Sequence, residues 1–421
     1  MSKFVKLSSV SELTVGFVGT MAKHYESHGV PFLRSLNVKP FKIVDDDMKY
    51  ISDEFSNSIS KSTLHKDDVI IVRTGIPGTC CVVPSEYDGC NCSDVVIVHP
   101  NPELVNPHYL AAYINVWGQR QIQNNKVGAI QQHFNVRSAE EMLVFLPDIH
   151  KQEKIAAVVV ALNSKIESNN AICAELEAMA KAHYDYWFMQ FDFPNADGKP
   201  YRSSGGEMVW NEQLKREIPK GWEAIPIVEC CEIVDCLHSK KPENKFETEQ
   251  CFLLQLENLS DMGLIDVRKK YYVSSQDYLE WTSKIELEDG DLLVTNAGRA
   301  GAIYRVPSGL YAGMGRNMTA IRATAIPPVM LYYFFNSVDT KRQIRANTDT
   351  GAFFESLNVR GIKQLNIALP PNPQLQVLEE FETICAPIRY QIEQCAKESD
   401  ELTKLRDWLL PMLMNGQATV K

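Results

Sequence analysis

Two glycine-flanked turns contain the residue types best suited to contact a phosphate or a base. One reads Gly75-Ile76-Pro77-Gly78 and the other reads Gly298-Arg299-Ala300-Gly301; each follows a short apolar run. Glycines let a backbone approach a phosphate closely, and an arginine can bind a phosphate or a guanine edge. Each turn is therefore a candidate contact with a polyanion. The structural alternative is a solvated arginine in an ordinary tight turn.

The sequence contains no convincing catalytic motif. Asn106-Pro107-His108-Tyr109 echoes the Asn-Pro-Pro-Tyr signature of adenine methyltransferases. However, no glycine-rich cofactor loop precedes it, and a proline at the first position of a helix explains the motif without chemistry. The sequence also lacks GxxxxGK[ST], HExxH and GxSxG. His183 has the spacing of a packed helix residue. From these observations together, we expect no catalytic residue in this chain.

The cysteines do not form a convincing metal or disulfide pattern. Their number, 11, is odd, and the start of the sequence lacks the apolar core of a secretory signal. A zinc site at Cys80, Cys81, Cys90 and Cys92 is possible, but the spacing departs from two matched pairs, and small buried thiols are the alternative. We predict reduced thiols, no metal site and a cytoplasmic location.

Composition is that of an ordinary soluble protein, with 45% hydrophobic and 23% charged residues. No apolar run approaches the roughly 20 residues of a membrane-spanning helix, so we expect no membrane contact. The net charge of −10 argues against indiscriminate binding to nucleic acid. Residues 295–363 nevertheless contain nine basic and only three acidic residues. This segment predicts a local positive surface.

The sequence contains an internal repeat. Residues 67–84 align with residues 290–307, so that Gly75 matches Gly298 at an offset of 223 residues. Gly128 matches Gly351 at the same offset, and Leu146-Pro147 matches Leu369-Pro370. Both copies open with short β-type runs separated by turns, and both end in a long helical pattern. We predict an α+β protein made of two mixed α/β domains related by a pseudo-twofold axis.

Each copy ends in a coiled-coil helix of roughly 40 residues, or about 60 Å. Apolar residues recur every three or four positions, and packing the two helices against each other in antiparallel orientation would cover both stripes. Asn169 and Ser399 are polar seam positions that either fix the register or border a solvated gap. The predicted seam comprises Ile155, Val159, Leu162, Ile166, Asn169, Cys173, Leu176, Ala180, His183 and Trp187 in the first helix, and Phe381, Cys385, Ile388, Ile392, Cys395, Ser399, Leu402, Leu405 and Leu409 in the second.

The order of several short motifs resembles the specificity subunits of type I restriction-modification systems. They include the linker FDFPNADGKPYRSSGG at 191–206, MVWN at 208–211 and IPKGWE at 218–223. The Leu-Pro pairs before both helices and LMNGQ at 413–417 also fit, so the resemblance covers nearly the whole chain. It implies target-recognition domains at 1–148 and 207–370, and spacer helices at 149–190 and 371–421.

The resemblance implies a non-catalytic reader of double-stranded DNA with a bipartite, gapped target. The paired helices would separate the two readers and dock two modification subunits, which bind S-adenosylmethionine and methylate adenine. Restriction subunits, which use ATP and Mg²⁺, would join the complex later. No cofactor is implied for this chain itself. A lone adenine methyltransferase and a coiled-coil scaffold that binds no DNA are the alternatives.

We predict DNA contacts at the two turns and at nearby basic residues, which could instead line polar helix faces. The aromatic run at 332–335 could stack on bases but fits better the buried side of a helix. The predicted DNA-contact residues are Arg73, Thr74, Gly75, Gly78, Arg120, Lys126, Asn296, Gly298, Arg299, Gly301, Arg316, Lys341, Arg342 and Arg345.

Overall fold

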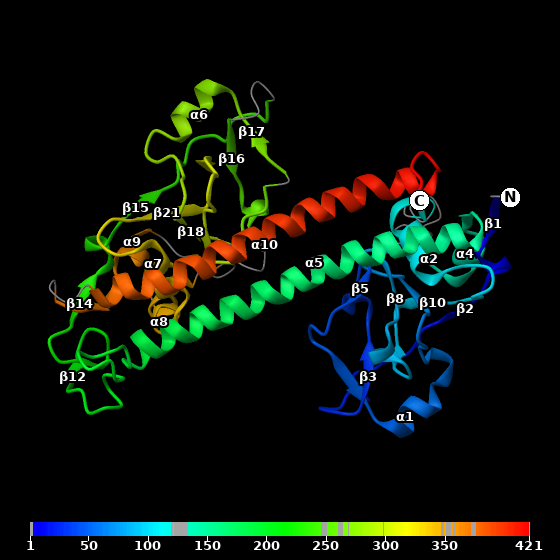
Figure 1. Ribbon diagram of the computed structural model, residues 1–421, viewed down its shortest axis with the longest axis horizontal. Coiled ribbons are helices and arrows are strands. Elements are labelled where there is room, and N and C mark those ends of the chain that lie inside the picture. The colour runs from blue at the N-terminus through cyan, green and yellow to red at the C-terminus, as the bar shows by residue number, and fades with distance from the viewer. Residues whose placement is uncertain are drawn as a thin grey trace. The chain divides into compact units, whose positions relative to one another are not determined.

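The computed structural model describes residues 3–118, 121, 134–245, 251–259, 264–267, 269–297, 299–346, 349–350, 355–356, 359–371 and 376–420. The chain divides into two compact units (Figure 1). Unit 1 comprises Met1–Asn170 and Lys397–Lys421, and unit 2 comprises Ala171–Ala396. Among the described helices, none is long and apolar enough to cross a bilayer.

Unit 1 is built around a four-stranded antiparallel sheet in the order β2-β10-β7-β8. Its strands are β2 (Ser11–Val15), β10 (Val95–Pro100), β7 (Val69–Val72) and β8 (Cys80–Val82). All four residues of β7 are buried, because apolar side chains cover both faces of this strand. Smaller sheets complete the unit: β1 (Lys3–Lys6) with β11 (Leu143–Leu146), β6 (Lys49–Ile51) with β3 (Val30–Leu33) and β9 (Asn91–Cys92), and β4 (Val38–Lys39) with β5 (Lys42–Ile43).

Unit 2 repeats this topology. Its four-stranded sheet has the order β15 (Cys231–Asp235), β21 (Met318–Ala323), β18 (Leu292–Thr295) and β19 (Ile303–Arg305). The strands correspond in order to β2, β10, β7 and β8. The other sheets pair β14 (Glu223–Pro226) with β24 (Asn366–Leu369), β17 (Tyr271–Tyr272) with β16 (Phe252–Leu254) and β20 (Gly313–Met314), β12 (Met208–Asn211) with β13 (Arg216–Pro219), and β22 (Asp349–Thr350) with β23 (Glu355–Ser356).

One short helix in each unit contacts both the four-stranded sheet and a long helix. In unit 1, Asn106 caps α2 (Pro107–Tyr113) by accepting a hydrogen bond from the Tyr109 amide at 3.1 Å. The Asn-Pro-His-Tyr motif is therefore a helix start, as its structural interpretation predicted. In unit 2, all four aromatic residues at 332–335 are buried in α7 (Pro328–Asn336), as predicted. The other short α-helices are α1 (Asp53–Ser58), α4 (Val136–Glu140), α6 (Ser275–Trp281), α8 (Val338–Ala346) and α9 (Val359–Lys363).

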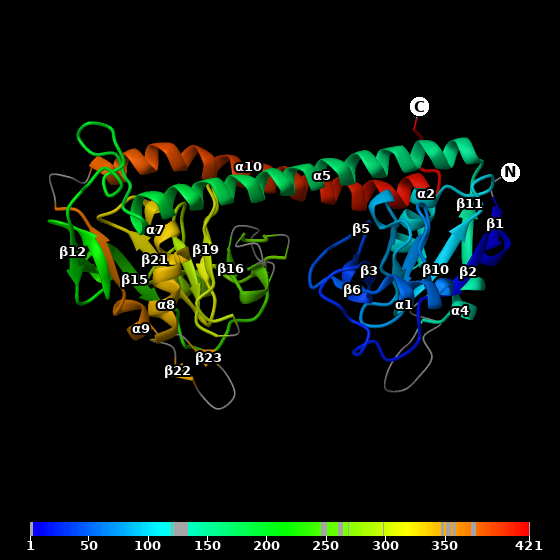
Figure 2. The same cartoon turned by 90° about the horizontal axis from the view of Figure 1, so that it is seen from below.

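The long helices α5 (Ile149–Tyr184) and α10 (Gln376–Met414) pack antiparallel within each unit (Figure 2). In unit 1, Asn163 contacts Arg406 and Asn169 contacts Glu398. In unit 2, the Cys173 thiol lies 3.5 Å from the Ile392 carbonyl oxygen, and Glu177 binds Arg389. Residue numbers thus rise along one helix as they fall along the other. The predicted seam residues of the first helix are all buried or half-buried, including Trp187, which lies just beyond the end of α5.

The predicted seam of α10 was wrong at one position. Leu405 is 44% exposed, whereas Ile388, Ile392, Ser399 and Leu402 are buried or half-buried. The next seam residue after Leu402 is Arg406, four positions later, and not Leu405. The Arg406 guanidinium lies 4.7 Å from the Phe41 ring centre and donates a hydrogen bond to the Asn163 side chain. The position expected for leucine packing is therefore taken by a cation–aromatic contact.

The two polar seam residues do not bind each other. Asn169 is buried and donates from Nδ2 to Glu398 Oε2 at 2.7 Å. Lys165 pairs with the same carboxylate at 3.2 Å. Asn169 Oδ1 and Ser399 Oγ are buried, and each has no hydrogen-bond partner within the described part of the chain. The Asn169–Glu398 contact therefore relates one turn of α5 to one turn of α10 in unit 1.

Candidate nucleic-acid interface

The first candidate turn connects β7 to β8 in unit 1. Gly75 and Gly78 have φ angles of 85° and 95°, which favour glycine. The Gly78 amide donates to the Val72 carbonyl at 3.0 Å and closes the turn. Arg73 is held at its base, because its Nε donates to the Phe134 carbonyl at 3.2 Å. The turn is thus a tight projection on a fixed strand pair.

The second candidate turn connects β18 to β19 in unit 2 and has the same construction. The Gly301 amide donates to the Thr295 carbonyl at 2.8 Å, which is the counterpart of the Gly78 bond. The Ala302 amide donates to the Arg299 carbonyl at 3.0 Å, just as Thr79 donates to Ile76 at 3.3 Å. These bonds place Ile76 and Arg299 at the same position in the two turns.

Arg299 is partly engaged within its own unit. Its Nη2 donates to the Leu259 carbonyl, and its guanidinium carbon lies 5.9 Å from the Tyr304 ring centre. Gln255, Asn258 and the short helix Leu256–Asn258 precede Leu259 in the chain. Arg299 therefore joins the turn to a neighbouring loop, in addition to any contact that it makes with a ligand.

Neighbouring loops lie beside each turn at one end of the sheet. In unit 1 the Arg73 amide donates to the Asp94 carbonyl at 3.0 Å, and the Phe17 amide donates to Cys92 at 2.7 Å. We name this set, residues 16–18, 73–78 and 93–94, the turn edge of unit 1. In unit 2 the Asn296 amide donates to the Asn317 carbonyl at 2.9 Å, which brings the exposed Arg316 to the corresponding edge.

The turn edge of unit 1 lies at the end of the strands that faces away from α5. The opposite end of β10 leads into Leu104, whose carbonyl accepts a hydrogen bond from Gln152 of α5 at 3.2 Å. The strand directions can be followed in Figure 2. A ligand could therefore reach the turn edge without displacing the long helix.

The other predicted contacts are distributed differently. Lys341, Arg342 and Arg345 lie on α8, which is held against β24 because Gln343 exchanges two hydrogen bonds with the Asn366 main chain. Thr74 and Asn296 lie at the two turns; the Asn296 side chain accepts a hydrogen bond from Thr319 at 2.9 Å. Arg120, Lys126 and Gly298 lie outside the described residues.

Partners from outside the basic segment 295–363 neutralise part of its charge. Arg322 binds Asp291 at 2.6 Å and Glu288 at 3.3 Å. Arg305 binds Asp289 at 2.9 Å and also pairs with Glu393 of α10. The positive surface is therefore smaller than the sequence predicted, because acidic residues before and after the segment fold against it.

Sequence reasoning missed Ile76, which was placed in the turn but not among the contact residues. Its side chain is 75% exposed, and Val18 at the same edge is 73% exposed. The signal was present in the repeat, since Ile76 aligns with Arg299. A position at which two copies of one turn carry different exposed side chains is a candidate for differing specificity.

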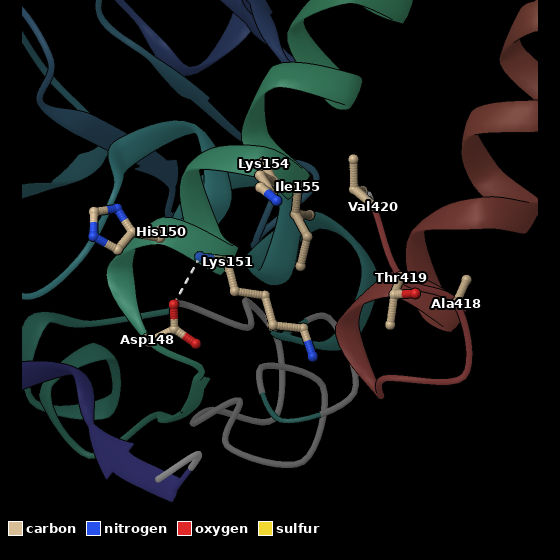
Figure 3. Close-up of a pocket in the computed structure, with 8 residues that line it drawn as sticks. All are labelled: Asp148, His150, Lys151, Lys154, Ile155, Ala418, Thr419 and Val420. Atoms are coloured by element: carbon tan, nitrogen blue, oxygen red, sulfur yellow. Dashed lines mark hydrogen bonds between the residues drawn. The ribbon is translucent and has the colours of Figure 1, made fainter.

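A separate pocket of about 300 Å³ lies in unit 1 between the start of α5 and the C-terminal segment (Figure 3). Asp148 accepts a hydrogen bond from the Lys151 amide at 3.0 Å, and so caps the helix. Lys151, Lys154 and His150 line one side, and residues 418–420 line the other. None of the predicted DNA-contact residues that the structure describes lines this pocket.

The cysteines suggested as a zinc site do not converge. Cys80 belongs to one hydrophobic cluster, and Cys81 and Cys92 belong to another. Burial raises the pKa of the Cys90 thiol to about 11, so it is protonated at neutral pH. Within the described ranges, the one group of three potential ligands is Asp235, Cys236 and His238. The Cys236 thiol is packed in a hydrophobic cluster, while Asp235 pairs with His238 at 3.0 Å.

Comparison with known proteins points to one class. No family model matches the chain. The specificity subunit of the type I restriction enzyme MjaIX from Methanocaldococcus jannaschii is 22% identical over 282 residues, which cover 67% of this chain and 62% of that subunit. The HindI specificity subunit from Haemophilus influenzae is 27% identical over 156 residues, 34% of each chain. The chain thus spans about three fifths and one third of these relatives.

The fold points to the same class. A crystal structure of the type I restriction-modification S subunit from M. genitalium matches with a TM-score of 0.60 at 13% identity, covering 98% of this chain and 96% of the other. At this identity the match shows a shared fold. The chain is therefore similar in sequence to specificity subunits of type I restriction enzymes, and it shares its fold with a solved S subunit.

Proposed function

We propose that this chain is the DNA-specificity subunit of a type I restriction-modification complex. Each unit reads one half of a bipartite, gapped double-stranded target through its turn edge. The repeated fold carries the proposal: two units whose four-stranded sheets have the same strand order present equivalent turns with different side chains, such as Ile76 and Arg299. Because the side chains differ, the two half-sites differ in sequence.

The long helices serve as the spacer in this proposal. α5 has 36 residues, which corresponds to about 54 Å at 1.5 Å per residue. Their antiparallel seam within each unit supports a pseudo-twofold arrangement in which two unlike readers are held at one separation. The outer surfaces of the helices dock two modification subunits, and restriction subunits join through them.

Catalysis belongs to the partners. The modification subunits bind S-adenosylmethionine and methylate adenine, and the restriction subunits use ATP and Mg²⁺. The Asn106 side chain, which a methyltransferase would direct at its target base, instead caps α2. The purified chain should therefore transfer no labelled methyl group to DNA until modification subunits are added. Transfer by the chain alone would favour the methyltransferase alternative.

Methylome sequencing of cells with and without the gene tests the proposal directly. We expect an adenine-methylated motif with two specified halves and an unspecified gap, which disappears when the gene is removed. An unchanged methylome in cells that express the modification subunits would instead favour a scaffold without DNA recognition.

A further inference from the structure

Ile76 lies in the turn between β7 and β8, at the turn edge of unit 1. Its side chain is 75% exposed, although a branched aliphatic side chain gains nothing from contact with water. Gly75 and Gly78 on either side adopt positive φ angles, and a Cβ added to Gly75 would meet nothing within 4 Å. The turn therefore projects Ile76 into open space from a rigid base.

A second apolar side chain shares this edge. Val18 is 73% exposed and follows Phe17, which forms a bridge with Ser93 in the loop that also contacts Arg73. Single exposed apolar residues are common, but two at adjoining loop tips suggest a surface that is covered when a partner binds. Such a partner must have an apolar group that the narrow turn carrying Ile76 can contact.

The repeat indicates what kind of partner this is. Ile76 and Arg299 hold the same position in the two turns, and both accept the same backbone hydrogen bond from the residue three positions later. An arginine at such a tip can bind guanine or phosphate, whereas an isoleucine can form no hydrogen bond through its side chain. If both turns contact DNA, they must recognise different groups.

The chemistry of the major groove leaves one group for isoleucine. β7 lies inside the four-stranded sheet, so the part of unit 1 that can enter the groove here is the turn between β7 and β8. The groove admits elements as wide as a two-stranded β-ribbon, and the apolar feature displayed on its base edges is the C5-methyl group of thymine. We propose that Ile76 is a specificity-determining residue that packs against a thymine methyl group in the half-site read by unit 1. This inference rests on the proposed function and identifies a base within that function's target.

Replacing thymine by deoxyuridine in the target tests the contact, since it removes the methyl group and keeps the base pair. The assembled complex is titrated against duplexes in which each thymine of the half-site assigned to unit 1 is replaced in turn. Complexes containing wild-type chain, Ile76→Ala and the control Leu104→Ala are compared. Leu104 is also exposed, at 46%, but it lies beyond the opposite end of β10.

We expect at least one replacement to weaken binding of the wild-type and Leu104→Ala complexes about fourfold, the effect of withdrawing one methyl group from contact. The Ile76→Ala complex should not respond to that replacement. Specific binding with an equal response in all three complexes, or with no response in any, would overturn the role of Ile76 and leave the proposed function intact. Absence of sequence-specific binding by the wild-type complex would overturn both.

Discussion

Asp68 and Asp291 occupy the same position in the two units, and each binds a basic side chain on a neighbouring strand. Asp68 Oδ1 lies 2.6 Å from Nδ1 of His99, and Asp291 accepts from Nε and Nη2 of Arg322 at 2.8 and 2.6 Å. Both carboxylates are buried, and each also accepts the backbone amide three residues earlier. The repeat has thus kept an ion pair while exchanging histidine for arginine.

Because histidine titrates near neutral pH and arginine does not, this exchange predicts that the stability of unit 1, but not that of unit 2, depends on pH through this pair. The hydrogen bond to Asp68 raises the pKa of His99 above its usual 6.5. A raised histidine pKa stabilises the fold fully below pH 6.5, and that contribution is lost as the pH rises through the folded-state value. We expect amide protection of Val69–Val72 to fall by about 1 kcal/mol from pH 6 to pH 9.

His99→Arg is the matched variant, because arginine stays charged across this range. Hydrogen exchange of the β7 peptides, corrected for intrinsic rates, should show little pH dependence in this variant. An equal fall in the wild type and in His99→Arg would exclude His99 as its source.

At the scale of elements, one buried cation joins α5, α10 and α7 in unit 2. Arg389 is 3% exposed, its guanidinium lies 4.3 Å from the Tyr332 ring centre, and it pairs with Glu177. Removing one partner of a buried pair leaves an uncompensated charge, whereas replacing the cation by an apolar residue does not. The two ends of this pair should therefore respond differently to mutation.

Glu177→Ala should lower the free energy of unfolding by about 2 kcal/mol, less than for a fully buried pair because about a third of Glu177 is exposed. Arg389→Met should cost less, and the double variant should recover part of the loss. Urea unfolding followed by tryptophan fluorescence measures all three. A larger loss in Arg389→Met would show that its packing on Tyr332, rather than its charge, governs this junction.

Matched insertions in the two long helices test the proposed spacer. Seven residues that keep the seam are inserted between Asn170 and Ala171 and between Ala396 and Lys397, where the units meet in sequence. Both insertions preserve the contacts inside each unit and lengthen the helices by about 10 Å, or about three base pairs. Methylome sequencing should show unchanged half-sites separated by a gap about three base pairs longer. An unchanged gap in an active variant would mean that the helices do not set the spacing.

Elements with a long repeating pattern could be predicted from sequence, whereas the contacts between them could not. The spacing of Ile155, Asn169 and their equivalents predicted both helices and most of the seam. The prediction that Leu405 lies in the seam was wrong because Arg406 packs on Phe41, which is far away in the sequence, and so occupies the buried stripe of α10. Arg305 counted toward the predicted positive surface because its partner Glu393 lies 88 residues later in the sequence. Such pairs depend on tertiary contacts that local spacing does not encode.

At the scale of the whole molecule, the chain contains one fold twice. The four-stranded sheets have the same order, and two of the smaller sheets also correspond: β1–β11 to β14–β24, and β6-β3-β9 to β17-β16-β20. β1 pairs with β11, and both strands lie within residues 1–148. This segment therefore contains every described strand of the sheets in unit 1. It relies on the long helices for part of its hydrophobic cluster, through Leu410, Leu413 and Met414.

Exchange of residues 1–148 for the matching segment of a relative is the most direct test of the central claim, provided that the contacts with α5 and α10 are kept. The chimera is expressed with the modification subunits, and adenine methylation is mapped across the genome. We predict that one half of the methylated motif changes, while the other half and the gap remain. A motif in which both halves change, or neither does, from a folded and active chimera would contradict the account.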